Sequence, residues 1–158
     1  MTVVTVPTVA DMRAVGRRLA GLVRAGDLLV LTGDLGAGKT ALAQGIGAGL
    51  GVRGQVTSPT FVIARVHPSL ADGPPLVHVD AYRLGALAEV DDLDLDATLD
   101  ESVTVVEWGG GMVEGLSDDR LEIEIRRAAD STDETRQVTI TAVGPRWTRA
   151  DLGSLTTH

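Results

Sequence analysis

The chain of 158 residues contains no cysteine, and aromatic residues make up only 3% of it. The first absence excludes disulfide bonds, thiolate metal sites and a cysteine nucleophile, and it is consistent with a reducing compartment. The second means that the core must be built from aliphatic side chains, since hydrophobic residues still account for 44% of the sequence. The length suits one domain, which is large enough to bury a core without cross-links.

Long apolar runs are also missing. No stretch approaches the roughly 20 apolar residues of a membrane-spanning helix, and residues 1–7 have neither a basic start nor an extended apolar run. We therefore expect no signal peptide, no contact with a membrane and a cytoplasmic location.

Basic residues are fewer than acidic ones, 14 against 22, so the formal net charge is −8. Phosphate contacts dominate the affinity of nucleic-acid binders, so this chain is a poor candidate for holding RNA or DNA alone, and a partner would have to do so. Lys39 is the only lysine among the 14 basic residues. A lysine retained where arginine serves elsewhere indicates a position that requires a compact ammonium group.

Helical periodicity begins after Pro7. Met12, Val15, Leu19 and Leu22 fall on one face and predict a helix that ends at Gly26. A second helix, rich in small residues, is expected over 41–50, and one or two short helices within the acidic segment 84–101.

Apolar and alternating segments between these helices predict an α/β domain over residues 1–145, followed by a loosely ordered tail over 146–158. The last two predicted strands alternate with period two, which is typical of an antiparallel hairpin with one face in solvent. The expected strands cover residues 2–6, 28–32, 61–66, 76–79, 103–106, 120–127 and 137–143.

Residues 33–40 read Gly-Asp-Leu-Gly-Ala-Gly-Lys-Thr and match the phosphate-loop pattern G-x-x-x-x-G-K-[ST]. The glycines let backbone N–H groups face phosphate oxygens, and the helix that follows adds the positive end of its dipole. The Lys39 ammonium would reach the outer phosphates, and the Thr40 hydroxyl would ligate Mg²⁺. The predicted nucleotide-binding residues of this segment are Gly33, Asp34, Gly36, Ala37, Gly38, Lys39, Thr40 and Ala41.

Two further apolar strands end in carboxylates, at Asp80 and Glu107. Ligands of open α/β sheets lie at the carboxyl ends of the strands. If these strands are parallel neighbours of the strand before the phosphate loop, both acids would serve Mg²⁺ or the attacking water. The spacing does not distinguish the two roles, and for either acid alone a solvated strand end is an equal alternative.

Other polar segments have simpler interpretations. Thr57 to Thr60 lie where nucleotide switches contact the γ-phosphate, although on spacing alone an ordinary Ser-Pro turn is favoured. His78 lies within a strand, where a structural role is expected. The acidic segment 89–101 lacks the glycine and the final glutamate of a calcium loop, so it is a solvated face or a docking surface for a basic partner.

Four segments of the chain belong together: residues 33–40, Ser58-Pro59-Thr60-Phe61, His78-Val79-Asp80-Ala81-Tyr82-Arg83-Leu84 and Val106-Glu107-Trp108. In this order and spacing they resemble the TsaE family (also called YjeE), and the resemblance extends from the first helix to Trp147. It implies a three-layer, P-loop NTPase-like α/β domain with a mixed, partly parallel sheet. It also implies binding of ATP or ADP with Mg²⁺ and weak ATP hydrolysis. The implied partners are the TsaB and TsaD proteins, which transfer a threonylcarbamoyl group to adenosine 37 of certain tRNAs, so that tRNA is met only through the complex.

The resemblance also assigns roles to single residues. Glu107 matches the metal-associated acid of the family, Asp80 an acid of the Mg²⁺ shell or one that positions water, and Thr60 a switch-like hydroxyl. Trp108 is expected near the nucleotide, and Arg136 matches a recurrent arginine. The expected catalytic residues are thus Lys39, Asp80, Glu107 and Thr60, and the expected metal ligands are Thr40, Glu107 and Asp80. The chain departs from the family at 109–111, where three glycines replace a proline or an acid, and at Met12, where many members have threonine.

Two other functions fit a phosphate loop. A small-molecule kinase usually carries an arginine-rich lid, whereas residues 84–119 contain no arginine or lysine. A nucleotide-dependent switch or scaffold is the second alternative, although a GTP switch would need a second lysine to read its base. Turnover stimulated by a low-molecular-weight acceptor would favour the kinase, and turnover stimulated only by partner proteins would favour the ATPase subunit.

Overall fold

The structure is a computed structural model that describes residues 2–33, 38–52, 64–70, 73–80, 101–107, 119–127 and 135–147. The helices among these residues are α1 (Val9–Ala20), α2 (Lys39–Leu50) and a short 3₁₀ helix (Pro145–Trp147). The strands are β1 (Thr2–Val6), β2 (Leu28–Gly33), β3 (Ala64–His67), β4 (Leu76–Asp80), β5 (Val103–Glu107), β6 (Arg120–Arg127) and β7 (Arg136–Val143).

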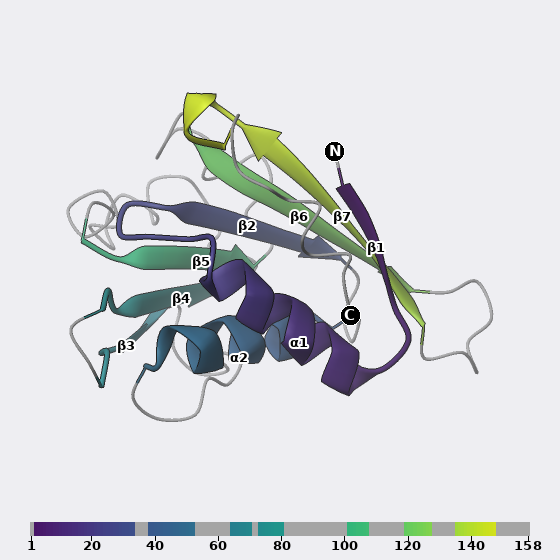
Figure 1. The fold of residues 1–158 in the computed structure, drawn as a ribbon, viewed down its shortest axis with the longest axis horizontal. Helices are drawn as coiled ribbons and strands as arrows, with labels where there is room; N and C mark the ends of the chain where they lie inside the picture. The colour runs from purple at the N-terminus through teal and green to yellow at the C-terminus, as the bar shows by residue number, and fades with distance from the viewer. Residues whose placement is uncertain are drawn as a thin grey trace.

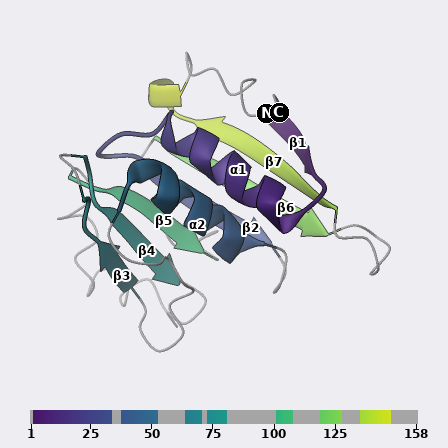
Figure 2. The ribbon, with the colours of Figure 1, turned by 60° about the horizontal axis from the view of Figure 1, so that its bottom comes forward.

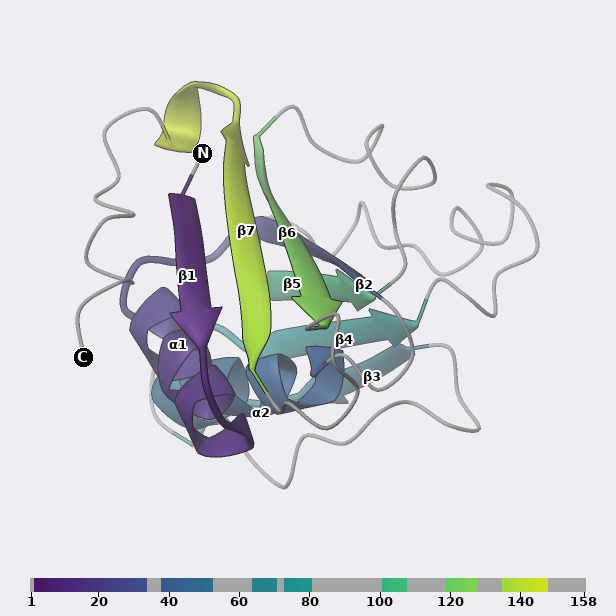
Figure 3. The same cartoon turned by 90° about the vertical axis from the view of Figure 1, so that its right-hand side faces the viewer.

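The strands form one mixed sheet of seven strands in the order β1-β7-β6-β2-β5-β4-β3 (Figure 1). The central strands β6, β2, β5 and β4 run parallel to one another. At the two sides, β7 and β3 pair antiparallel, and β1 adds an antiparallel edge next to β7 (Figure 3). This topology confirms the predicted mixed sheet with an antiparallel β6–β7 pair at its C-terminal side.

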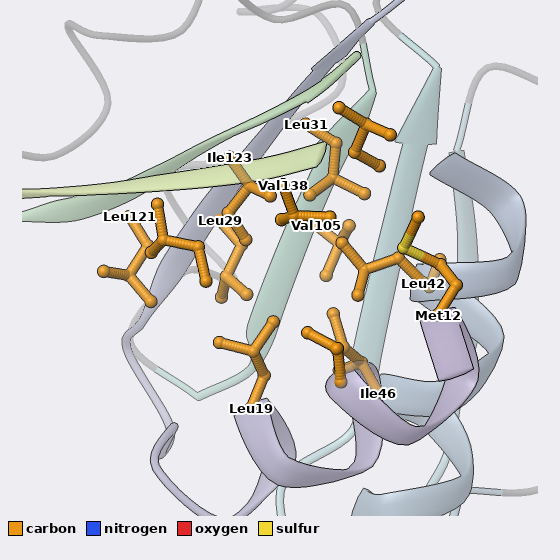
Figure 4. Close-up of a cluster of buried hydrophobic side chains, with 14 of the residues drawn as sticks. Met12, Leu19, Leu29, Leu31, Leu42, Ile46, Val105, Leu121, Ile123 and Val138 are labelled. Carbon is orange, nitrogen blue, oxygen red and sulfur yellow. The ribbon is translucent and has the colours of Figure 1, made fainter. Parts of the chain in front are cut away.

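Helices α1 and α2 lie next to each other on the same face of the sheet (Figure 2). Apolar side chains from both helices meet those of the sheet and form the main core (Figure 4). The core positions labelled in that view are Met12, Leu19, Leu29, Leu31, Leu42, Ile46, Val105, Leu121, Ile123 and Val138. No helix among the described residues has the length and apolar character required to cross a membrane.

The central strands are buried on their second face as well. Leu28 and Val30 of β2, Val77 and Val79 of β4, and Val106 of β5 all have at most 3% of their surface exposed. Burial on both faces is typical of parallel strands that lie between two layers. The described part of the chain shows the sheet and one helical layer, and the short helices predicted within 84–101 lie outside it.

Strands β6 and β7 have one buried and one wet face, as predicted. Leu121, Ile123 and Ile125 are buried, whereas Glu122 and Glu124 between them are half-exposed. Successive side chains of a strand point to opposite faces, so this alternation places the carboxylates away from the helices.

Helix α1 is shorter than the predicted segment. It ends at Ala20, where the Gly21 N–H donates to the Arg18 carbonyl at 3.1 Å and the Leu22 N–H donates to the Leu19 carbonyl at 2.9 Å. Leu22 still packs against the core, but from the turn that follows the helix. The prediction that Gly26 ends the helix is wrong, because Gly26 has φ 97° and turns the chain into β2 instead.

The first turn of α1 is capped by its own side chains. The Thr8 hydroxyl accepts from the Asp11 N–H at 3.2 Å and donates to the Asp11 carboxylate at 2.8 Å. We expect Thr8→Ala to lower the free energy of unfolding by about 1 kcal/mol, since one N–H of the helix end loses its acceptor. Urea denaturation measures this loss. Thr8→Ser keeps the hydroxyl and should remain close to wild type, so equal losses in both variants would contradict the capping role.

The core extends beyond the predicted boundary at residue 145. Trp147 is only 2% exposed and belongs to the main core, where it follows the 3₁₀ helix after β7. Its assignment to a loose tail is therefore wrong, because a large aromatic side chain gains more by burial than the chain loses by ordering one more turn. Residues 148–158 lie outside the described part of the chain.

Candidate functional site

The junction between β2 and α2 has backbone geometry that favours glycine. Gly33, the last residue of β2, has φ 153°, and Gly38, which precedes α2, has φ 115°. Side chains strain the backbone in this region of φ, so glycine at both ends of the predicted phosphate loop has a conformational reason. Asp34, Gly36 and Ala37 lie outside the described residues, and their predicted contacts with nucleotide remain predictions.

Lys39 is the first residue of α2, and its side chain is 5% exposed. The ammonium Nζ donates to the Gly33 carbonyl at 2.7 Å. A buried ammonium is costly unless its hydrogens are bonded, and this contact helps to meet that requirement. The side chain of the only lysine of the chain thus reaches from the start of α2 back to Gly33, the first residue of the predicted phosphate loop.

The N-terminus of α2 is left open to an anion. Its cap residue Gly38 has no side chain to bond the first N–H groups, and the first turn has no acidic residue. Helix α1 differs, because Thr8 caps it and Asp11 lies in its first turn. A helix terminus whose cap residue offers no side chain, and whose dipole no acidic residue compensates, is favourable for phosphate. Thr40 and Ala41 follow Lys39 in this turn and are half-buried.

The two acidic residues predicted to serve the phosphate site end neighbouring strands at the same edge of the sheet. Strands β2, β5 and β4 are parallel neighbours, as the prediction required. In this register Glu107 pairs with Leu31, two residues before Gly33, and the backbone of Asp80 pairs with that of Glu107. The carboxyl ends of the three strands therefore bring the phosphate loop and both acidic residues together.

Glu107 has a specific partner in the structure. Its Oε2 lies 2.8 Å from Nε2 of His78, and the two side chains are 5% and 0% exposed. Sequence reasoning missed this contact because the order of the strands was unknown. The signal that could have found it is the two-residue period of strand side chains. This period places His78 and Glu107 on one face of the sheet once β4 and β5 are known to be neighbours in this register.

The donor atoms fit Mg²⁺ better than a metal held by protein alone. The described residues hold no group of three or more histidine, aspartate or glutamate side chains that could bind a metal ion. Mg²⁺ is commonly bound by one or two carboxylates, with water and substrate phosphates completing its shell. The buried Glu107 carboxylate and the Thr40 hydroxyl fit that pattern of hard oxygen ligands.

The remaining predicted residues divide into two groups. Arg136 begins β7 opposite Arg127 of β6, and its Nη1 donates to the Thr135 carbonyl at 3.2 Å. Because β6 runs parallel to β2, Arg136 lies at the phosphate-loop end of the sheet, two strands from β2. Thr60 and Trp108 lie outside the described residues.

Comparisons with known proteins agree with this architecture. Residues 6–138 match the family model described as threonylcarbamoyl adenosine biosynthesis protein TsaE. The tRNA threonylcarbamoyladenosine biosynthesis protein TsaE of Streptomyces coelicolor is 66% identical over 146 residues, which is 91% of this chain and 99% of the relative. The protein of the same name from Bacillus subtilis is 41% identical over 139 residues, 87% of this chain and 83% of the relative.

A solved structure shares the fold. The crystal structure of Bacillus subtilis YdiB matches with a TM-score of 0.73 and 36% identity, covering 92% of this chain and 88% of YdiB. The predicted family and fold class are thereby confirmed, since similarity at this level extends over nearly the whole chain. The chain belongs to the TsaE family.

Proposed function

We propose that the chain is a Mg²⁺-dependent ATPase, slow when alone, that supports threonylcarbamoyl transfer to adenosine 37 of tRNA together with TsaB and TsaD. The observation that carries the ATPase proposal is the Lys39 ammonium, held at the Gly33 carbonyl beside the open end of α2, with Glu107 in register on the neighbouring strand. The pathway is supported by membership of the family and by the names of the relatives.

Each residue of the site has a distinct task in this proposal. Lys39 exchanges the Gly33 carbonyl for the outer phosphates, and the first turn of α2 receives phosphate oxygens. Thr40 and Glu107 would hold Mg²⁺, which when bound neutralises charge on the phosphate oxygens. Asp80 is proposed to orient the attacking water or a water of the metal.

Two tasks fall on residues outside the described part of the chain. Thr60 is proposed to sense the γ-phosphate, and Trp108, which directly follows Glu107, to border the nucleotide. The formal net charge of −8 also supports a division of labour in which partner proteins hold the tRNA.

A reconstituted reaction tests the proposal. We expect ATP turnover by the purified chain to rise at least about tenfold when TsaB and TsaD are added. The reason is that binding of the partners is proposed to be coupled to the state of the ATP site. Glu107→Gln should abolish this stimulated turnover while nucleotide still binds in EDTA, since the amide is a poor Mg²⁺ ligand.

Three other outcomes would contradict the proposal. One is turnover that rises with a low-molecular-weight acceptor and yields its phosphorylated form, which would identify a kinase. Another is nucleotide binding without any turnover in the complete mixture of partners, threonylcarbamoyl-adenylate and tRNA, which would identify a switch or scaffold. The third is a Glu107→Gln variant with wild-type turnover, which would show that the Glu107 carboxylate takes no part in the site.

A further inference from the structure

His78 is fully buried on β4, the strand next to the β3 edge of the sheet, and its polar ring is not explained by apolar packing alone. It lies on β4 and is 0% exposed, and its neighbours on that face belong to the aliphatic core, among them Leu76 and Val105. Burying an imidazole among apolar side chains is unfavourable unless its nitrogens are bonded. The only hydrogen bond of the ring within the described residues runs to Oε2 of Glu107.

The two ring nitrogens have different surroundings. Nε2 contacts the Glu107 carboxylate at 2.8 Å, whereas Nδ1 is buried without a hydrogen-bond partner in the described part of the chain. An ionised carboxylate only accepts hydrogen bonds, so the proton of this contact belongs to Nε2. In the neutral tautomer that donates from Nε2, Nδ1 is an acceptor, which costs less to bury unbonded than an N–H group would.

We propose that His78 is a positioning residue that fixes the Glu107 carboxylate for Mg²⁺, an inference that rests on the function proposed above. The Nε2–H group bonds Oε2, so the proposed oxygen for the ion is Oε1. A glutamate side chain has three rotatable bonds, and a buried donor at 2.8 Å restricts them before the ion arrives. The strand pairing makes this possible, because β4 and β5 carry both side chains on one face.

The effect should appear in the Mg²⁺ dependence of nucleotide binding. We expect His78→Leu, which removes the donor at similar volume, to raise the Mg²⁺ concentration needed for tight ADP binding by at least about tenfold. ADP affinity in EDTA should not change, because the proposed role of the ring acts only through the metal ligand Glu107. Isothermal titration of ADP at a series of free Mg²⁺ concentrations measures both quantities.

Three further variants separate positioning from general stability. His78→Gln places an amide donor near the position of Nε2 and should restore most of the Mg²⁺ response. Val77→Ala removes buried volume from the opposite face of β4 and should destabilise the protein without changing that response. In a Glu107→Gln background, His78→Leu should have little further effect, because the two side chains act through one interaction.

The wild-type protein provides an independent readout if His78→Leu does not fold. The chain has three histidines, and ¹⁵N spectra of the imidazole rings should show His78 protonated at Nε2 and bare at Nδ1. The absence of its signals in His78→Gln assigns them. A proton on Nδ1 alone would overturn the proposal, because that tautomer cannot donate to Glu107.

The outcomes also separate this proposal from the function on which it rests. If wild-type ADP affinity does not respond to Mg²⁺, both are refuted. If the wild type responds and His78→Leu responds at the same Mg²⁺ concentration, only the role of His78 is refuted. A shift in His78→Leu that adds fully to that of Glu107→Gln would likewise refute it.

Discussion

Replacing Lys39 by alanine is expected to weaken ATP binding at least about a hundredfold, which corresponds to about 2.7 kcal/mol. Lys39 is 5% exposed and its ammonium is already held at 2.7 Å from the Gly33 carbonyl, so it needs little reorganisation to meet a phosphate. Charge-assisted bonds in a site of low dielectric are much stronger than the same contacts in water. Titration with ATP under saturating Mg²⁺ measures the loss.

A matched control isolates the position from the charge. Arg13→Ala removes the same unit of charge from the exposed face of α1 and should leave ATP affinity nearly unchanged, since exposed charges are screened. Lys39→Arg keeps the charge but puts a planar fork where a compact ammonium lies, so it should bind ATP almost as weakly as the alanine variant. Wild-type affinity in Lys39→Ala would refute the nucleotide site.

The local elements were predictable from the sequence because their signals are local. Strand β6 (Arg120–Arg127) alternates over its whole length, and its predicted bounds agree with the structure. Helix α2 is preceded by the glycines of the phosphate loop and followed by Gly51, whose φ of 69° ends it. Spacing therefore placed these elements to within one or two residues.

The arrangement of the strands was not predictable in the same way. The antiparallel pairing of β1 with β7 joins residues more than a hundred positions apart, such as Val4 and Val138. Nothing in the alternation of either strand specifies its neighbour, because any strand with one apolar face could fill that place. The convergence of Asp80 and Glu107 was consequently a conditional prediction until the parallel order β2-β5-β4 was known.

The residues of the site also differ in whether their signals are local. The phosphate loop is a contiguous motif, so Lys39 could be assigned from spacing alone. The partner of Glu107 is 29 positions away on another strand, and its identity depends on the register of β4 against β5. The expectation that His78 is structural followed from the strand alone, whereas the specific task proposed above depends on its contact with a predicted metal ligand.

Replacing Gly45 by alanine is expected to lower the free energy of unfolding by about 3 kcal/mol, although alanine is favoured in helices by about 1 kcal/mol. A Cβ atom at Gly45 would lie 2.1 Å from the carbonyl oxygen of Arg13, which belongs to the backbone of α1. Gly16 meets α2 as closely, with its Cβ position 2.4 Å from the Leu42 carbonyl. Backbone cannot rotate away as a side chain can, so the helices would have to separate and open the core between them.

Gly21→Ala provides the matched control. Gly21 has φ −73°, and a Cβ atom there meets nothing closer than 3.4 Å, so the variant should be as stable as wild type or slightly more stable. Thermal unfolding should show a loss of about 6–12 °C for Gly45→Ala and none for Gly21→Ala. Equal melting temperatures in the two variants would mean that the helices adjust without cost and that their close approach is not required.

The same substitution should also affect the nucleotide site. Met12 of α1 packs against Gly38 at the end of the phosphate loop, where an added Cβ would lie 3.1 Å from the methionine methyl carbon. Moving α1 away from α2 therefore removes the packing of Met12 against Gly38, the residue that precedes Lys39. We expect folded Gly45→Ala at low temperature to bind ATP more weakly than Gly21→Ala. Equal affinities would show that the phosphate loop holds its shape without α1.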